Sequence, residues 1–130
     1  MTEPKWVLDE IVISVHQVLI AEHGGSPGVR DMGLLESALA KPRQIFSYQA
    51  KATIFDLAAG YGFGLAKNHP FIDGNKRAAL ATAAIFLEIN GYTLDAPEAE
   101  AIVVFEKLAA GDLSATELAE WLSDSSLCNG

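Results

Sequence analysis

One segment, residues 68–77, concentrates the side chains of this chain that could perform chemistry. It reads Asn-His-Pro-Phe-Ile-Asp-Gly-Asn-Lys-Arg and joins a polar loop to the start of an alanine-rich helical pattern. The first turn of a helix presents unpaired backbone N–H groups and the positive end of the helix dipole, which together favour an anion. The segment is therefore predicted to bind phosphate.

The residue types in this segment match the parts that phosphoryl or nucleotidyl transfer requires. His69 is suited to take the proton from an attacking hydroxyl group as a general base. Asp73 offers the carboxylate oxygens that hold Mg²⁺ together with substrate phosphates. Phe71 is expected to anchor the loop in the core. The expected phosphate-binding groups are those of Gly74, Asn75, Lys76 and Arg77.

Taken singly, these residues have simpler explanations. A histidine beside a proline often caps or packs, Asp-Gly is a common turn, and a basic pair at a helix start is ordinarily solvated surface. Their concentration within nine residues favours a ligand site instead. Lys76 and Arg77 also oppose the dipole at the start of a helix, and an anion bound there would relieve that conflict.

The elements that must position this segment are almost all helical by their apolar periodicity. Asp9, Asp31 and Ser114 are predicted N-caps, Pro97 a first-turn residue and Gly91 a left-handed helix end. The segment 43–50 lacks helical period and is expected to be extended, which allows a short β-hairpin flap. Residues 1–130 thus form one all-α domain of about six helices, expected over 9–22, 31–41, 53–67, 75–90, 97–110 and 114–122, with 75–90 central.

Composition and charge exclude several classes of protein. The 130 residues carry a net charge of −8, and the acidic excess lies in residues 88–130, which argues against non-specific nucleic-acid binding. That acidic part serves solubility or a basic partner segment. Cys128 is the single cysteine, so no disulfide framework or zinc spacing exists. The sequence shows neither a signal peptide nor a membrane span, so a cytoplasmic protein is expected.

Residues 69–77 also resemble a known signature. His-Pro-Phe-Ile-Asp-Gly-Asn-Lys-Arg matches H-P-F-x-[DE]-G-N-[GK]-R of the Fic/Doc superfamily at every constrained position. Residues 24–31, 33–39 and 86–91 are similar to its Doc (death-on-curing) toxin branch. The resemblance implies an α-helical Fic fold and ATP-dependent transfer to a protein hydroxyl with Mg²⁺. It assigns catalysis to His69, Asp73, Lys76 and Arg77, the metal to Asp73, and phosphate binding to Gly74, Asn75, Lys76 and Arg77.

Two positions indicate which group is transferred. AMP-transferring members of the superfamily usually carry a second glycine where this chain has Lys76, and a further arginine where it has Leu80. The resemblance to Doc toxins therefore implies a nucleotide bound with its γ-phosphate toward His69. The implied activity is that of a protein kinase that phosphorylates elongation factor Tu and blocks translation.

The resemblance also implies partners and regulation. The inhibitory helix of many Fic enzymes carries [ST]-x-x-x-E-[GN], and its nearest match here, residues 116–121, ends in Trp121. Self-inhibition is therefore not expected, and a Phd-type antitoxin whose C-terminal segment covers the loop is expected instead. Residues 44–49 are expected to dock the target backbone by strand addition. The alternatives are an AMP transferase of the same fold and a helical binding module without catalysis.

Overall fold

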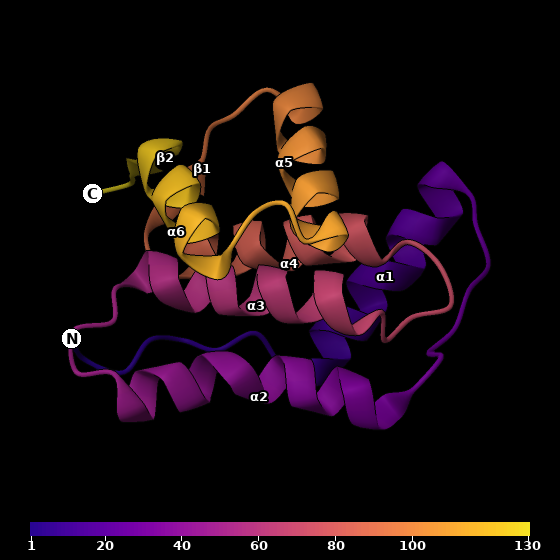
Figure 1. Ribbon diagram of the computed structural model, residues 1–130, viewed down its shortest axis with the longest axis horizontal. Coiled ribbons are helices and arrows are strands. Elements are labelled where there is room, and N and C mark those ends of the chain that lie inside the picture. The colour runs from indigo at the N-terminus through magenta and orange to yellow at the C-terminus, as the bar shows by residue number, and fades with distance from the viewer.

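Six helices and one two-stranded sheet make up the computed structural model, which describes residues 1–130 (Figure 1). The all-α fold of about six helices is confirmed. The elements are α1 (Asp9–His23), α2 (Met32–Tyr48), α3 (Ile54–Asn68), α4 (Asn75–Ile89), β1 (Tyr92–Leu94), α5 (Glu98–Ala110), α6 (Ala115–Asp124) and β2 (Ser126–Cys128).

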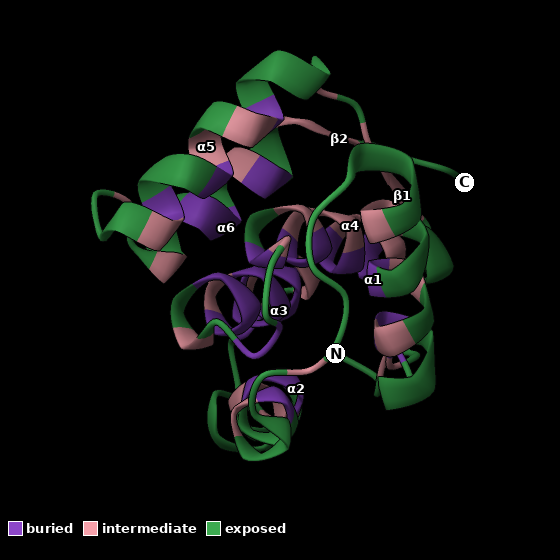
Figure 2. Cartoon of the chain, turned by 90° about the vertical axis from the view of Figure 1, so that its right-hand side faces the viewer, coloured by how far each residue is buried: buried purple, intermediate pink, exposed green.

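Helix α3 lies in the middle of the molecule, with α2 below it and α5 and α6 above it in Figure 1. It packs against α2, α4, α5 and α6, whereas α4, the helix predicted to be central, packs against α1, α3, α5 and β1. The buried residues gather on α3 and α4 (Figure 2). Both helices are therefore interior, and the loop that joins them is held by the core at each end.

Glycines on α3 allow the neighbouring helices to approach closely. A Cβ atom at Gly64 would lie 3.2 Å from Ala38 of α2, and one at Gly62 would lie 3.0 Å from the ring of Phe105 of α5. Glycine lowers helix propensity by roughly 1 kcal/mol relative to alanine. The burial that this close packing permits offsets that cost.

Two predictions about residues 31–50 are wrong, the end of the helix and the extended segment that follows it. Helix α2 was expected to end before Pro42, with an extended segment over 43–50, but it continues through Pro42 to Tyr48. Pro42 is buried and packs against Gly60 of α3, where an added Cβ atom would lie 3.5 Å from Pro42 and 2.9 Å from Ile45. This burial compensates the backbone hydrogen bond that proline cannot make. Residues 44–48 are helical, so the predicted strand addition at 44–49 is wrong.

Helix ends were predicted with mixed success. Asp31 caps α2, Ser114 caps α6 within a capping box, and Gly91 has a φ of +93°, as expected. Helix α1 is instead preceded by Leu8, with Asp9 in its first turn, and Pro97 is the N-cap of α5 rather than its first residue. These differences shift the boundaries by one residue and leave the helices unchanged.

The small sheet joins strands that lie far apart in the sequence. β1 pairs antiparallel with β2, with Tyr92 opposite Cys128 and Leu94 opposite Ser126. The strands are separated by α5 and α6, so the β structure lies at the C-terminal end rather than at residues 43–50. None of the helices combines the length and the apolar character that crossing a membrane demands.

Candidate active site

The loop from α3 to α4 carries the predicted site residues. His69 ends α3 in a left-handed conformation with φ of +48°, and Gly74 precedes α4 with φ of +75°. The loop pairs with residues 28–31: Val29 forms an antiparallel bridge with Phe71, and the N–H of Ile72 donates to the carbonyl oxygen of Gly28 at 3.1 Å. A distant segment therefore holds the loop along its length.

Arg30 fixes the chain around His69. Its Nε donates to the carbonyl oxygen of His69 at 2.8 Å, and its second guanidinium nitrogen donates to that of Asn68 at 3.0 Å. These bonds satisfy two carbonyls at the end of α3, where an α-helix leaves its last carbonyls without partners. Arg30 was not among the predicted site residues, although it lies in the turn-rich segment 24–31.

Phe71 anchors the loop as predicted, since it is only 1% exposed. Its ring stacks on the imidazole of His16 from α1, with centroids 3.8 Å apart and planes 6° apart. Nε2 of His16 donates to the carbonyl oxygen of Asp73 at 2.8 Å. His16 was also absent from the predicted site residues, since it lies outside the segment 68–77.

Asn75 serves the loop itself. Its side-chain oxygen accepts from the N–H of Phe71 at 2.9 Å, and its amide nitrogen donates to the carbonyl oxygen of Phe71 at 3.0 Å. The side chain is buried with these bonds satisfied. The Asn75 side chain therefore closes the turn between Phe71 and α4. Phosphate binding by Asn75 stays a prediction.

The Asp73 carboxylate sits at the start of α4. Oδ1 accepts from the N–H of Gly74 at 2.8 Å, and Oδ2 accepts from the N–H of Ser26 at 3.3 Å. No group of three or more histidine, cysteine or acidic side chains in the chain could hold a metal ion. A single carboxylate beside the predicted phosphate site would suit Mg²⁺, which is usually held by one or two carboxylates together with phosphates and water.

A cavity of about 370 Å³ brings the predicted residues together. It is of the size that small-molecule ligands occupy. One wall comes from the end of α1, including Ile20 and His23, and the other from the loop and the first turn of α4. All six predicted site residues line it: His69, Asp73, Gly74, Asn75, Lys76 and Arg77. His23 is a second imidazole in this cavity that the sequence did not single out.

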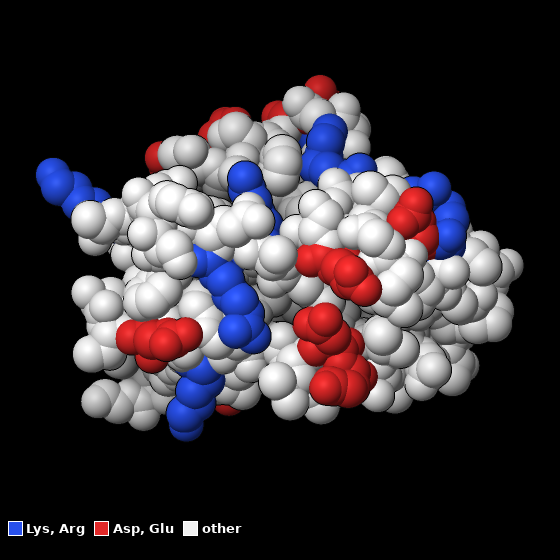
Figure 3. Space-filling model, turned by 90° about the horizontal axis from the view of Figure 1, so that it is seen from below, with Lys and Arg blue, Asp and Glu red and all other residues white.

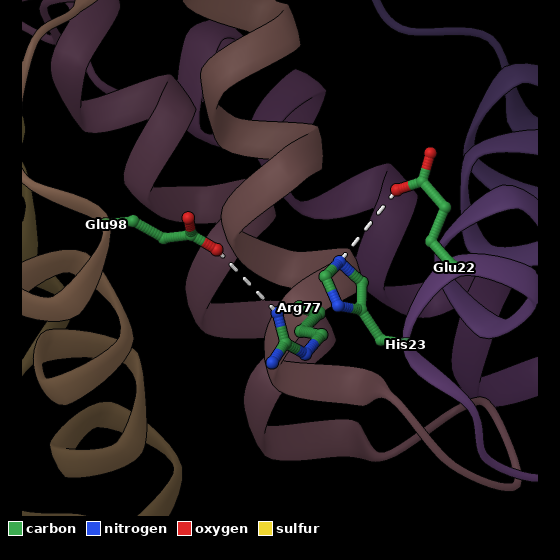
Figure 4. Close-up of polar contacts among 4 residues, drawn as sticks. All are labelled: Glu22, His23, Arg77 and Glu98. Carbon is green, nitrogen blue, oxygen red and sulfur yellow. Dashed lines mark ion pairs between the residues drawn. The ribbon is translucent and has the colours of Figure 1, made fainter.

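The electrostatics of the cavity favour an anion. Helix α4 begins without a side-chain cap and without an acidic residue in its first turn, so its N–H groups are left for a ligand. Arg77 forms one ion pair, with the carboxylate of Glu98 on α5 at 4.0 Å (Figure 4), and both side chains are well exposed. An exposed ion pair at this distance contributes little. Arg77 is therefore free to bind phosphate.

The face drawn in Figure 3 carries acidic and basic side chains side by side, and neither sign covers it. The cavity itself is lined by two cations, Lys76 and Arg77, and one carboxylate, that of Asp73.

Comparison with known proteins identifies the family of the chain. The profile of the Fic/DOC family matches residues 6–87, which include α1 to α3, the whole loop and α4 as far as residue 87. The chain belongs to the Fic/DOC family. It is 33% identical to "Protein kinase doc" of Escherichia phage P1 over 114 residues, covering 87% of this chain and 89% of that protein. It is 46% identical to "Toxin Doc" of Mycolicibacterium smegmatis over 74 residues, covering 56% of this chain and 57% of that protein.

This Fic/DOC chain keeps its C-terminal helix away from the site. Glu120, the glutamate in the partial inhibitory pattern, lines a separate groove with Thr53 and Ile54 at the start of α3. His69 lies at the other end of α3, a helix of 15 residues that spans roughly 20 Å. Trp121 donates instead to Glu100 of α5 at 3.0 Å. Helix α6 is thus part of the fold and supplies no inhibitory glutamate to the cavity.

Proposed function

We propose that this chain is a Doc-type toxin that acts as a protein kinase. It transfers the γ-phosphate of ATP to a hydroxyl of a translation factor, elongation factor Tu, in the cytoplasm. One observation supports the proposal above the others: an imidazole, a single carboxylate and an uncapped helix start with two cations line one cavity. The similarity to "Protein kinase doc" supports the same activity.

Each residue of the cavity has a separate role in the proposed transfer. His69 accepts the proton of the target hydroxyl, whose oxygen then attacks the γ-phosphorus. The bond from the γ-phosphorus to the bridging oxygen breaks, and ADP leaves with the electron pair. The N–H groups of α4 together with Lys76 and Arg77 hold the phosphates and stabilise the charge of the transition state.

Asp73 is the residue of this chain suited to hold Mg²⁺. When bound, the ion neutralises phosphate charge during transfer. Ser26 and Gly74 donate to the Asp73 oxygens and limit how the carboxylate can turn. The carboxylate is thereby kept at the start of α4, beside the expected phosphates.

The direction of the nucleotide rests on Lys76. A glycine at this position leaves space for a polyphosphate tail, whereas the lysine side chain brings a positive charge into the same cavity. Leu80 also takes the place where AMP-transferring relatives usually carry an arginine. Both residues favour a γ-phosphate, rather than an α-phosphate, near His69.

Labelled ATP tests this proposal against AMP transfer. The purified chain is incubated with elongation factor Tu and either γ-labelled or α-labelled ATP. A kinase leaves label on the target only from γ-labelled ATP, and an AMP transferase only from α-labelled ATP. If neither ATP labels the target and Mg²⁺-ATP does not raise the melting temperature, the binding-module alternative holds, since a bound ligand stabilises the native state.

We also propose that an antitoxin of the Phd type covers this cavity with its C-terminal segment. Nothing within the chain closes the site, because α6 and its Glu120 lie at the far end of α3. Expression of the chain alone should then arrest growth, and co-expression of the antitoxin should restore it. Normal growth without the antitoxin would contradict the proposal.

A further inference from the structure

His16 is a buried polar residue in contact with the site, although nothing in the proposed reaction uses it. It lies on α1, 57 residues before Asp73, and is 1% exposed. An imidazole in such surroundings loses its hydration, and this loss is costly unless a hydrogen bond replaces it. The replacement is the 2.8 Å bond from Nε2 to the carbonyl oxygen of Asp73.

This hydrogen bond defines the state of the ring. A carbonyl oxygen can only accept, so Nε2 of His16 must carry a hydrogen. The Asp73 carbonyl belongs to the same planar peptide group as the N–H of Gly74. That N–H in turn donates to Oδ1 of Asp73 at 2.8 Å. The imidazole is thus hydrogen-bonded to the peptide group whose N–H orients the Asp73 carboxylate.

The ring is itself held in place. One face stacks on Phe71, with parallel planes and a centroid separation of 3.8 Å. A Cβ atom at Gly74 would lie only 3.7 Å from Nε2. The imidazole therefore lies between Phe71, which anchors the loop, and Gly74, which precedes α4, and the stacking and the hydrogen bond limit its rotation.

We propose that His16 is a positioning residue for Asp73. By fixing the peptide between Asp73 and Gly74, it sets the direction of the Asp73 carboxylate relative to the first turn of α4. A metal ion held by this carboxylate would then lie next to a phosphate bound at the start of α4. The inference rests on the proposed function of the cavity. A phenylalanine at position 16 could supply the stacking on Phe71 but not the hydrogen bond to Asp73. Replacing His16 by phenylalanine therefore distinguishes positioning by the hydrogen bond from packing of the ring.

The test compares His16→Phe, which keeps an aromatic ring, with His16→Gln, whose amide can replace the Nε2–H donor. For each variant, γ-phosphate transfer is measured across a Mg²⁺ titration. We expect His16→Phe to raise the Mg²⁺ concentration for half-maximal rate about tenfold or more, the usual effect of losing an outer partner of a metal ligand. His16→Gln should recover most of that loss.

Two results overturn the inference. One is a His16→Phe variant with the Mg²⁺ dependence of the wild type. The other is a His16→Gln variant impaired as much as His16→Phe, which would show that only ring packing matters. If His16→Phe does not fold, the wild-type protein is used for the test. Its ¹⁵N-histidine NMR spectrum must contain a slowly exchanging Nε2–H of His16. A rapidly exchanging Nε2–H would rule out the hydrogen bond.

Failure of the proposed function looks different. In that case the wild-type chain transfers label from neither ATP, whatever residue stands at position 16. The role of His16 is then read from Mg²⁺-dependent binding of a non-hydrolysable ATP analogue by calorimetry. Equal Mg²⁺ dependence of that binding in the wild type and His16→Phe contradicts the positioning role, and a weakened dependence in His16→Phe supports it.

Discussion

Gly25 lies so close to Asp73 that a Cβ atom added to this glycine would come within 2.7 Å of Oδ2 of the aspartate. Gly25 also has a φ of +115°. Gly91, beyond the other end of α4, has a φ of +93° but nothing within 4 Å of an added Cβ atom. Alanine at either glycine strains the backbone, but only alanine at position 25 also displaces the Asp73 carboxylate.

Gly25→Ala is expected to lower phosphate transfer at least tenfold, because the new methyl group pushes the Asp73 carboxylate from its place and small misplacements of reacting groups are costly. Gly91→Ala is the matched control, because Gly91 does not line the cavity. Both variants should lose about 1–2 kcal/mol of stability from left-handed strain, and only Gly25→Ala should lose activity. Transfer assays and denaturant unfolding measure the two effects, and equal activities would contradict the assignment of Asp73.

His69→Asn tests the general base without disturbing the backbone. Asparagine tolerates the left-handed conformation that His69 adopts at φ of +48°, and the carbonyl that binds Arg30 remains. We expect the rate of transfer to fall by about 10²–10⁴-fold, as when a general base is lost, with a melting temperature close to that of the wild type. Unchanged growth arrest and unchanged transfer by this variant would remove His69 from the mechanism.

Lys76→Ala tests the anion site. The change removes one of two cations at the start of α4, so we expect the KM for ATP to rise about tenfold, the order of a lost hydrogen bond to a charged group. Lys41→Ala removes the same charge from an exposed position on α2, outside the cavity, and should leave the KM unchanged. Steady-state kinetics at fixed ionic strength compare them, and equal KM values would rule out phosphate binding by Lys76.

Tyr61→Phe tests the core and its pH dependence. The Tyr61 oxygen accepts the N–H of Val7 at 3.1 Å. Burial raises the pKa of Tyr61 above 10.0, although the hydrogen bond from Val7 opposes the shift. At neutral pH the variant leaves the Val7 N–H buried without an acceptor, so the free energy of unfolding should fall by about 1–2 kcal/mol.

The raised pKa fixes the sign of the pH effect. The neutral phenol is favoured in the folded state, so its contribution is complete below pH 10 and is lost as the pH rises through the folded-state pKa. The wild type should therefore lose stability above pH 10 more steeply than Tyr61→Phe. Tyr48→Phe is the control, because Tyr48 is 86% exposed. Parallel curves for the wild type and Tyr61→Phe in urea unfolding would refute the prediction.

The error at residues 43–50 shows where local signals mislead. Pro42 and the following β-branched and aromatic residues are typical of a helix end and an extended segment. Their effect is outweighed by burial of Pro42 against Gly60, which lies 18 residues further along the chain. A local pattern contains no information about such a partner, so the end of α2 could not be predicted.

The sequence alone determined the helical class, the caps at Asp31 and Ser114, and the placement of residues 68–77 at the start of a helix, because all of these depend on residues within a few positions of one another. The tertiary structure decided what surrounds that segment. His16, Ser26 and Arg30 reach the loop from 39 to 57 residues away. Their contacts exist only once α1 and the segment 24–31 pack against it, since folding alone brings such distant groups within hydrogen-bonding distance.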